Sequence, residues 1–263
     1  MRLLVTGATG FLGAQVVPEL ERRGHDVVGV GRRDGDLAEP GSAERLLDAH
    51  APDAVVHLAA VVGRLVGDED PAATIRANVT AAALVARACA TRPTRLAYGS
   101  TTDVTAPQNL YAWTKRWGEE ATLLFVPDAL LLRIGMPYGP GKGAIPNMLR
   151  QALARERIPV HRGEVRSWCW AGDTAAAIAR LLESGSEGAW NVARDDDPRT
   201  MREAAELACR LTDAPADLID EIEPPHGSAP QVVSSEPLRA LGWSPQVELD
   251  EGMRRVLTSM APR

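Results

Sequence analysis

The chain has 263 residues, of which 45% are hydrophobic and 24% are charged. This length allows one large α/β domain, or a nucleotide-binding domain with a smaller cap, and the composition is that of a globular protein without a disordered tail. The formal net charge of -6 argues against a DNA or RNA partner, because nucleic-acid-binding domains normally present a basic face to the phosphates.

The cysteines and the N-terminal segment exclude further classes of protein. Cys89, Cys169 and Cys209 are far apart in the sequence, without a C-x-x-C pair or a histidine cluster at metal-ligand spacing, so we expect reduced thiols and no metal site. The N-terminus has only a short apolar run before a glycine-rich turn, which is typical of neither a signal peptide nor a membrane span. We therefore expect a cytoplasmic protein.

Short apolar runs alternate with segments of helical period, which is the pattern of repeated βαβ units around a parallel sheet. The expected strands of the first half are residues 2–6, 26–30, 54–58, 95–99 and 129–134. The expected helices between them are residues 12–23, 43–49, 72–90 and 112–124. Further helices are expected near residues 146–155, 174–183, 201–212 and 250–260, separated by short strands and proline-bearing loops.

This order predicts an α/β fold, a Rossmann-type doubly wound parallel sheet with a small C-terminal substrate-binding cap. A loop rich in glycine and proline at residues 137–143 is the best candidate for a domain junction. We expect the sheet domain to comprise residues 1–135 and 172–193, and the cap residues 136–171 and 194–263. The substrate is expected between the two.

A glycine-rich segment joins the first expected strand to the first expected helix, with G-x-x-G-x-x-G spacing from Gly7 to Gly13. Glycines permit a tight turn close to a pyrophosphate, and the helix N-terminus offers free N–H groups and a positive dipole end. A turn needed only for packing is the alternative, but the position between strand and helix favours a dinucleotide. The predicted cofactor contacts on this segment are Gly7, Thr9, Gly10, Phe11, Leu12 and Gly13.

The residues after the second expected strand favour NADP over NAD. NAD-preferring folds usually place an acidic residue there, whereas this chain has Arg32 and Arg33, whose guanidinium groups can bind a 2'-phosphate. Solvated surface arginines are the alternative, and the nearby Asp34 or Asp36 leaves some room for NAD. Asp36 and Leu37 are expected beside the adenine ring.

Tyr111 and Lys115 lie four positions apart on an expected helix, so their side chains share one face, one turn apart. A free tyrosine is a poor acid or base at neutral pH, but a neighbouring ammonium stabilises its phenolate. A surface pair without function is the alternative. The preceding strand would end at the cofactor crevice, which favours a proton-transfer pair.

Hydroxyl side chains follow the fourth expected strand, at Ser100, Thr101 and Thr102. The carboxyl edge of a parallel sheet is where ligands collect, so a hydroxyl there could hold a substrate oxygen. Turn and cap chemistry is the alternative. We favour Thr101 as the catalytic hydroxyl.

Taken together, several segments resemble the extended short-chain dehydrogenases/reductases, the NAD-dependent epimerase/dehydratase family. The resemblance covers nearly the whole chain: residues 6–13, 56–60, Asn78, residues 100–102, Tyr111 to Lys115, residues 138–141, Arg166, Asp173, Asn191 and residues 241–245. It implies that Tyr111 is the acid/base, that Lys115 tunes it and anchors the nicotinamide ribose, and that Thr101 polarises a carbonyl. It also implies cofactor contacts at Leu58, Ala59, Ala60 and Asn78, with a structural role for the His57 side chain.

Departures from the family pattern bear on the substrate. Dehydratases carry an acidic pair after the catalytic threonine, but here Thr102 and then Asp103 follow it, so elimination is disfavoured. Met136 stands near the place of an asparagine that contacts the diphosphate of nucleotide sugars, and a second arginine expected near Gln231 is absent. The substrate-binding candidates are Thr102, Met136 and Arg166, the last able to grip a phosphate or to serve as a surface or domain-bridging arginine.

The sequence thus predicts an NADP(H)-dependent reductase that transfers a hydride to a ketone, most favourably a keto-sugar nucleotide or a secondary-metabolite ketone. A nucleotide-sugar epimerase with retained NAD and a non-catalytic NADP-binding regulatory protein remain alternatives. The expected partner is a small-molecule substrate, with neither nucleic acid nor membrane. Relatives often dimerise through helices flanking the active site, which leaves room for a homodimer.

Overall fold

A six-stranded parallel sheet forms the larger part of the molecule. The computed structural model describes residues 1–63, 69–224 and 232–261. The sheet strands are β1 (Arg2–Thr6), β2 (Asp26–Val30), β3 (Ala54–His57), β4 (Arg95–Thr101), β5 (Leu130–Ile134) and β10 (Gly188–Val192). Their spatial order is β10-β5-β4-β3-β1-β2, which confirms the predicted Rossmann-type sheet. The chain reverses its direction of progress between β1 and β3, and open α/β sheets bind ligands at this switch point.

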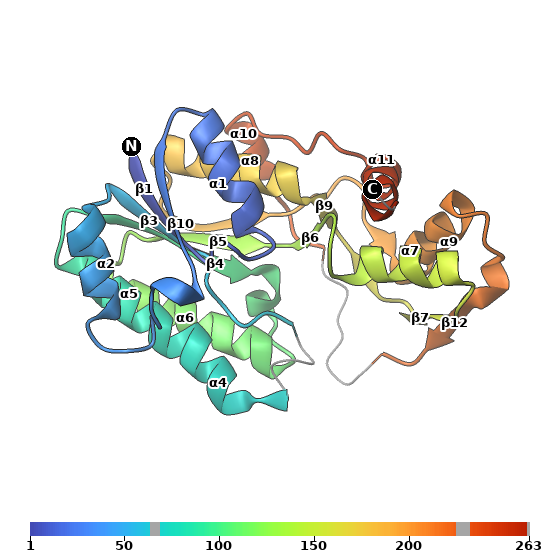
Figure 1. The fold of residues 1–263 in the computed structure, drawn as a ribbon, viewed down its shortest axis with the longest axis horizontal. Coiled ribbons are helices and arrows are strands. Elements are labelled where there is room, and N and C mark those ends of the chain that lie inside the picture. Colours follow the sequence, from blue (N-terminus) through green and yellow to red (C-terminus); the bar gives the residue numbers. More distant parts are fainter. Residues whose placement is uncertain (64–68, 225–231, 262–263) are drawn as a thin grey trace.

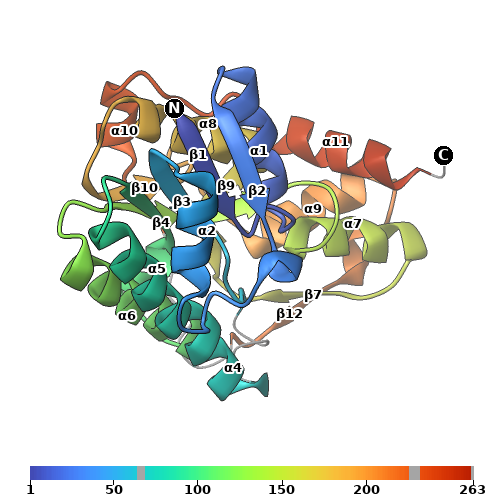
Figure 2. The same ribbon diagram turned by 60° about the vertical axis from the view of Figure 1, so that its left-hand side comes forward.

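Helices cover both faces of the sheet (Figures 1 and 2). One face carries α1 (Gly13–Arg22) and α8 (Ala171–Glu183), and the other carries α2 (Ser42–His50), α5 (Ala81–Ala90) and α6 (Leu110–Phe125). The inner strands β1, β3, β4 and β5 are almost entirely buried, which explains why they read as continuous apolar runs rather than alternating patterns. No helix in the described part of the chain has the length and apolar character needed to cross a membrane.

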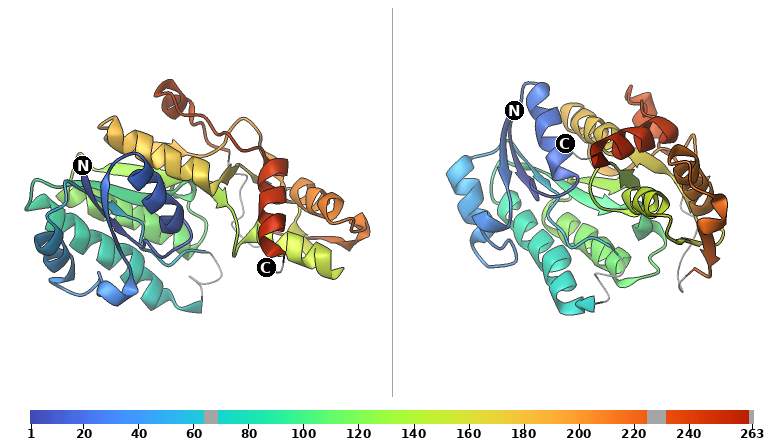
Figure 3. Two further views of the ribbon diagram at one scale, coloured as in Figure 1. Left: turned by 45° about the horizontal axis from the view of Figure 1, so that its top comes forward. Right: turned by 45° about the vertical axis from the view of Figure 1, so that its right-hand side comes forward.

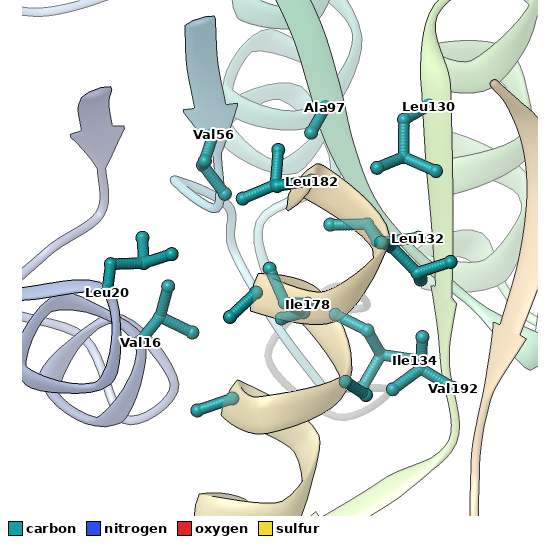
Figure 4. Close-up of a cluster of buried hydrophobic side chains, with 14 of the residues drawn as sticks. Val16, Leu20, Val56, Ala97, Leu130, Leu132, Ile134, Ile178, Leu182 and Val192 are labelled. Carbon is teal, nitrogen blue, oxygen red and sulfur yellow. The ribbon is translucent and has the colours of Figure 1, made fainter. Parts of the chain in front are cut away.

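In the core on the α1 and α8 face, apolar residues spaced one helical turn apart pack against the sheet. Val16 and Leu20 lie one turn apart on α1, and Ile178 and Leu182 lie one turn apart on α8. These side chains point toward the sheet, against strand residues such as Leu132 (Figure 4). Because these side chains are fully or almost fully buried, truncating Leu20 to alanine would cost about 2–5 kcal/mol.

The expected helix at residues 72–90 differs from the observed one. The structure has α4 (Pro71–Ile75), then a π-helical segment η2 (Arg76–Thr80), and then α5. Asp70 caps the N-terminus by accepting a hydrogen bond from the Ala73 backbone N–H. A π segment widens the helix by one residue per turn, and such segments often occur at functional sites.

A second core lies beside the sheet. It is formed by α7 (Ala144–Ala154), α9 (Met201–Leu211), α11 (Leu249–Met260) and the parallel pair β7 (Ile158–His161) and β12 (Ile219–Ile222). Figure 3 shows α11 lying against α7 and α9. The parallel pair β6 (Met136–Tyr138) and β9 (Trp168–Trp170) lies between this core and the sheet (Figure 1).

The smaller elements of the structure complete the chain. They are the pair β8 (Val165–Arg166) and β11 (Arg199–Thr200), the short helix α10 (Glu236–Ala240), and the 3₁₀ turns η1 (Arg32–Asp34), η3 (Thr102–Thr105) and η4 (Ala216–Leu218).

The division into 1–135 plus 172–193 and 136–171 plus 194–263 stays a prediction. The second core draws its residues from the predicted cap, whereas Leu238 and Trp243 from the same range pack in the core of the sheet. The Asp173 carboxylate on α8 accepts hydrogen bonds from the backbone N–H groups of Gln246 and Val247. These bonds tie the segment before α11 to the sheet side of the molecule.

Candidate active site

Several of the predicted site residues lie where neighbouring parallel strands end. Thr6 is paired in register with Val30 on one side and with His57 on the other, and His57 is paired with Tyr98. Thr101, the last residue of β4, is paired with Ile134. The segments that follow β1, β2, β3, β4 and β5 therefore meet along one edge of the sheet.

The glycine loop makes a close backbone approach at the switch point of the sheet. Gly7 has a φ of +70°, and a Cβ there would lie 2.7 Å from the backbone nitrogen of Ala59 after β3. A Cβ at Gly13 would lie 2.2 Å from the carbonyl oxygen of Gly7, so the first turn of α1 rests directly on the loop. The Gly10 backbone N–H donates to that same carbonyl oxygen at 2.9 Å.

This loop fits a dinucleotide. Thr9, Gly10 and Phe11 are exposed at the N-terminus of α1, where free N–H groups and the helix dipole favour a phosphate. Leu12 is half-buried and packs against the core of the sheet. At Gly10 the loop exposes backbone without a side chain, as close contact with a pyrophosphate requires.

Arg32 and Arg33 are exposed in η1, directly after β2. Thr9 of the glycine loop lies beside Gly31, the residue before them, because a Cβ at Gly31 would be 3.1 Å from the Thr9 hydroxyl oxygen. The Asp34 carboxylate turns back and accepts a hydrogen bond of 2.7 Å from the Gly31 backbone N–H. Across residues 1–63, 69–224 and 232–261 the structure shows no ion pair of either arginine.

Asp36 is held by a third arginine. Its carboxylate pairs with Arg76 of η2 and also accepts a hydrogen bond of 2.9 Å from the Ala38 backbone N–H. Arg76 pairs at the same time with Glu39, and its guanidinium lowers the pKa of the Asp36 carboxyl. Leu37, also predicted beside adenine, packs against the core under α2 and α5.

Asn78 orders the backbone after β3. Its side-chain amide accepts a hydrogen bond from the Val61 backbone N–H at 2.8 Å and donates to the Val61 carbonyl oxygen at 2.9 Å. The same amide nitrogen donates to the Thr114 hydroxyl at 3.0 Å. The segment with Leu58, Ala59 and Ala60 is thereby held to α6, next to Lys115.

His57 is buried beneath this segment. Its Nδ1 lies 2.7 Å from the Thr6 hydroxyl oxygen. Burial, together with the Lys115 ammonium, lowers the pKa of the imidazole to about 3. The ring is therefore neutral at physiological pH. This agrees with the structural role expected for the side chain.

Tyr111 and Lys115 occupy the first turns of α6, which Asn109 caps by accepting a hydrogen bond from the Ala112 backbone N–H. Burial, together with the Asp103 carboxylate, raises the pKa of the Tyr111 phenol, and a hydrogen bond with Thr101 opposes this rise. The phenol therefore stays protonated at neutral pH in the free protein. Thr101, Tyr111 and Asp103 form one electrostatic cluster at the end of β4.

Lys115 is almost fully buried, with 3% of its surface exposed. Burial lowers the pKa of its ammonium to about 7, and the Glu119 carboxylate one turn later opposes this shift. Glu119 itself forms a two-pronged pair with the Arg133 guanidinium on β5, at 3.0 and 2.8 Å. The lysine can thus gain or lose its proton near neutral pH, as a proton-transfer site requires.

The hydroxyl triplet lies partly within β4, which extends to Thr101 instead of ending at Gly99 as expected. Ser100, Thr101 and Thr102 are all buried. The Thr101 hydroxyl accepts a hydrogen bond from the Asp103 backbone N–H, so it combines turn chemistry with its contact to Tyr111. The Ser100 hydroxyl is buried without a hydrogen-bond partner in the described part of the molecule.

A family model and several known proteins match this arrangement. The model of the NAD dependent epimerase/dehydratase family matches residues 3–193. The chain belongs to this family. It is therefore an NAD(P)-dependent oxidoreductase of the extended short-chain dehydrogenase/reductase type, as the sequence predicted.

Individual relatives agree with the family match. The chain is 31% identical over 207 residues to the dTDP-4-dehydrorhamnose reductase of Mycobacterium tuberculosis. The match covers 71% of this chain and 67% of the relative. The UDP-glucose 4-epimerase of Thermus thermophilus, in complex with NAD, has a TM-score of 0.88 at 25% identity over 98% of each chain. The dTDP-4-dehydrorhamnose reductase of Bacillus anthracis, in complex with NADP, has a TM-score of 0.86 at 21% identity over 98% of this chain and 99% of the other.

The substrate-binding candidates of this epimerase/dehydratase chain lie on three different elements. Thr102 is buried at the start of η3, and Met136 is half-buried on β6, in register with Trp168. Arg166 lies on β8, outside the six-stranded sheet, with its guanidinium paired to the buried Glu164 carboxylate. Gln231 lies outside the described residues.

Several residues of the site were not predicted from the sequence. Glu119 lies four positions after Lys115, on the same helix face as Tyr111, so this spacing could have identified it from the sequence. Arg133, Arg76 and Tyr98 come from other elements, and only the fold brings them to the site. The register of β3 and β4, which places Tyr98 opposite His57, depends on strand pairing that a local pattern does not contain.

Proposed function

We propose that the protein is an NADP(H)-dependent reductase that converts a ketone, most favourably of a keto-sugar nucleotide, to a secondary alcohol. The observation that carries this proposal is the contact of the Tyr111 phenol with Thr101, one helical turn from the buried Lys115. These groups are an acid, a hydrogen-bond donor and a cation at the carboxyl edge of the sheet. The name of the Mycobacterium tuberculosis relative supports the substrate class.

The residues that would hold the cofactor follow from the geometry of the sheet edge. The glycine loop from Gly7 to Gly13 would hold the pyrophosphate, Asp36 and Leu37 would lie toward the adenine, and Leu58 to Ala60 with Asn78 would line the middle of the cofactor. When bound, the nicotinamide supplies a hydride to the carbonyl carbon. Lys115 would contact the nicotinamide ribose.

The chain's own groups handle the proton. Tyr111 donates its phenolic proton to the carbonyl oxygen while the Thr101 hydroxyl hydrogen bonds the same oxygen. The Lys115 ammonium stabilises the phenolate that remains, and a proton from solvent restores the phenol. The ketone gains one hydride and one proton, so the product is a secondary alcohol and the cofactor is oxidised.

The proposed preference for NADP rests on two acidic side chains that already have partners and two arginines that are exposed. Asp34 is bonded to the Gly31 backbone and Asp36 is paired with Arg76, so both acids predicted to leave room for NAD have other partners. Arg32 and Arg33 are exposed directly after Gly31, which lies beside Thr9, and they can bind a 2'-phosphate through charge-assisted hydrogen bonds.

We place the substrate between the sheet domain and the cap, with Thr102, Met136 and Arg166 as binding residues. Thr102 would extend the hydroxyl edge beyond Thr101. Arg166 would offer a guanidinium to a phosphate, in exchange for part of its pairing with Glu164. A nucleotide sugar would use this arginine, whereas a ketone without a diphosphate would not.

The proposal is tested by incubating the purified protein with NADPH and a panel of ketones. The panel holds dTDP- and UDP-linked keto sugars and ketones that lack a nucleotide, and oxidation is followed by the absorbance of NADPH. We expect consumption with a keto-sugar nucleotide, and faster turnover with NADPH than with NADH. Interconversion of nucleotide sugars by copurified cofactor, with no net NADPH oxidation, would identify an epimerase instead, and binding of NADP without turnover of any ketone would identify a regulatory protein.

A further inference from the structure

A tyrosine from the neighbouring strand lies under the active-site lysine. The Lys115 Nζ stands 4.3 Å from the centroid of the Tyr98 ring, over its face. Both side chains are buried, with 1% of Tyr98 and 3% of Lys115 exposed. Water therefore provides little solvation for this ammonium, and the negative face of the ring is in direct contact with it.

Tyr98 is held rigidly in this position. The residue is paired in register with His57 on β3, and their rings lie 5.9 Å apart. At the other end, the Tyr98 hydroxyl donates to the Asn78 carbonyl oxygen at 3.4 Å. A Cβ on Gly118 would lie 2.1 Å from the Tyr98 hydroxyl oxygen, so the glycine lets α6 come close enough for Lys115 to meet the ring.

Among the other ionisable groups around Lys115, the Glu119 carboxylate also favours the charged lysine. On β3, the buried His57 is neutral because its pKa is lowered to about 3. On α6, Tyr111 is a neutral phenol, and the Glu119 carboxylate is shared with Arg133 on β5 through two hydrogen bonds. On η3, Asp103 acts on Tyr111.

We propose that Tyr98 is a positioning residue whose ring face holds the Lys115 ammonium in its charged form, next to Tyr111. The aromatic face stabilises the cation without offering a proton acceptor, so Lys115 stays free to act on Tyr111 and on a ribose hydroxyl. A carboxylate in the same place would bind the ammonium more tightly and withdraw it from the site. This inference rests on the role proposed above for Lys115.

The composition of the chain allows a direct test. Lys115 and Lys142 are the two lysines in the sequence. Protein labelled with ¹³C at the lysine ε-carbon, in a Lys142→Arg background, gives a single lysine signal, whose chemical shift reports the titration of Lys115. The parent, Tyr98→Phe and Tyr98→Leu are compared in this background, without substrate or cofactor.

The three proteins separate the ring from the hydroxyl. Tyr98→Leu removes the aromatic face, so we expect the Lys115 titration midpoint to fall by about one pH unit, which corresponds to about 1.4 kcal/mol. Tyr98→Phe keeps the face and loses the bond to Asn78, so its midpoint should stay close to that of the parent. An unchanged midpoint in Tyr98→Leu, or an equal shift in Tyr98→Phe, overturns the proposal.

A second series keeps the test decisive if Tyr98→Leu does not fold. Phenylalanine analogues with an increasing number of ring fluorines at position 98 retain the shape of the ring while they weaken the negative potential of its face. The midpoint should fall stepwise with fluorination. A midpoint independent of fluorination would show that Tyr98 acts by packing alone.

These titrations are independent of the reaction. If no ketone in the panel is reduced but the midpoint shifts as expected, Tyr98 holds the ammonium and the proposed function is wrong. If ketones are reduced and the midpoint does not move, the function stands and the inference about Tyr98 fails. In an active reductase, the alkaline limb of the pH profile of kcat/KM should move with the Lys115 midpoint. A loss of folded protein would instead lower kcat/KM by the same factor at every pH.

Discussion

The side-chain amide of Asn78 donates a hydrogen bond to the hydroxyl of Thr114, the residue before Lys115, over a distance of 3.0 Å. The same amide forms two hydrogen bonds with the backbone of Val61. One buried side chain of the π segment thus links the backbone after β3 to α6, the helix that carries Tyr111 and Lys115.

Replacing Asn78 should therefore damage stability and cofactor binding together. Asn78→Ala leaves both polar groups of Val61 and the Thr114 hydroxyl without this partner, so the free energy of unfolding should fall by about 2–4 kcal/mol. NADP should also bind more weakly, since residues 58–60 lose their anchor. Urea denaturation and cofactor titration measure the two effects, with Thr80→Ala, an exposed neighbour on η2, as the control. Full stability in Asn78→Ala would contradict this account.

Alanine substitutions at two glycines of the same loop should have different effects, one on stability and one on cofactor binding. A Cβ at Gly13 would lie 2.2 Å from the Gly7 carbonyl oxygen and 2.7 Å from the Ala8 Cα, so Gly13→Ala must displace backbone. At the exposed Gly10, the nearest atom to a Cβ is the same oxygen at 3.0 Å. We expect Gly13→Ala to lower the melting temperature strongly and Gly10→Ala to fold but to bind the cofactor weakly. Equal melting temperatures for the two variants would refute the packing argument.

The buried lysine should destabilise the fold in a pH-dependent manner. Burial lowers the pKa of Lys115 from its ordinary 10.5 to about 7, so between these values the unfolded chain binds more protons than the folded one. The penalty is complete below pH 7 and declines as the pH rises toward 10.5. Lys115→Met should thus raise the free energy of unfolding by on the order of a few kcal/mol at pH 6 and by much less near pH 10.

Denaturant unfolding of the parent and of Lys115→Met at both pH values checks this, with the exposed Lys142→Met as the matched control. A stability difference that is the same at pH 6 and pH 10 would mean that Lys115 keeps an ordinary pKa. The gain in stability should accompany a loss of turnover, as is common where a charge is buried for function.

Local signals in the sequence were sufficient for much of the fold. The bounds of β1 and β2 match the expected residues 2–6 and 26–30, because each apolar run is bounded by turn residues and glycines. The π segment in the expected helix at 72–90 was missed, since an alanine-rich run carries no local sign of a widened turn. Within that segment, Asn78 contacts Thr114 of α6, a partner that only the folded chain brings near.

The candidate site also contains some features that local sequence signals predict and others that they do not. Tyr111 and Lys115 are one helical turn apart, so their spacing was visible in the sequence. The pairs Glu119–Arg133, Asp36–Arg76 and Lys115–Tyr98 join different elements, and their partners are set by strand order and helix packing. Such long-range contacts set the surroundings of Lys115 and of Asp36, which is why these surroundings could not be predicted from the sequence.

Arg32 and Arg33 should decide between the two nicotinamide cofactors. Each guanidinium can contribute about 1.5–3 kcal/mol through hydrogen bonds to a 2'-phosphate. The double variant Arg32→Ala/Arg33→Ala should therefore weaken NADP binding by about 100-fold or more and leave NAD binding nearly unchanged. Dissociation constants from calorimetry measure both, with the exposed Arg22→Ala on α1 as the control. Equal affinity of the parent for NAD and NADP would exclude this role.

Tyr111 should be needed for turnover but not for cofactor binding. Tyr111→Phe removes one hydroxyl group and keeps the ring, so the fold and the cofactor site should persist. A positioned general acid contributes about 10²- to 10⁴-fold to the rate, and kcat should fall by that factor while the dissociation constant of NADP changes by less than about threefold. Tyr138→Phe is a matched control, because its hydroxyl donates to the Glu248 carbonyl oxygen at 3.4 Å in the second core. If Tyr111→Phe retains parental kcat with the preferred ketone, the proton comes from another group and the mechanism proposed for the Thr101, Tyr111 and Lys115 cluster is wrong.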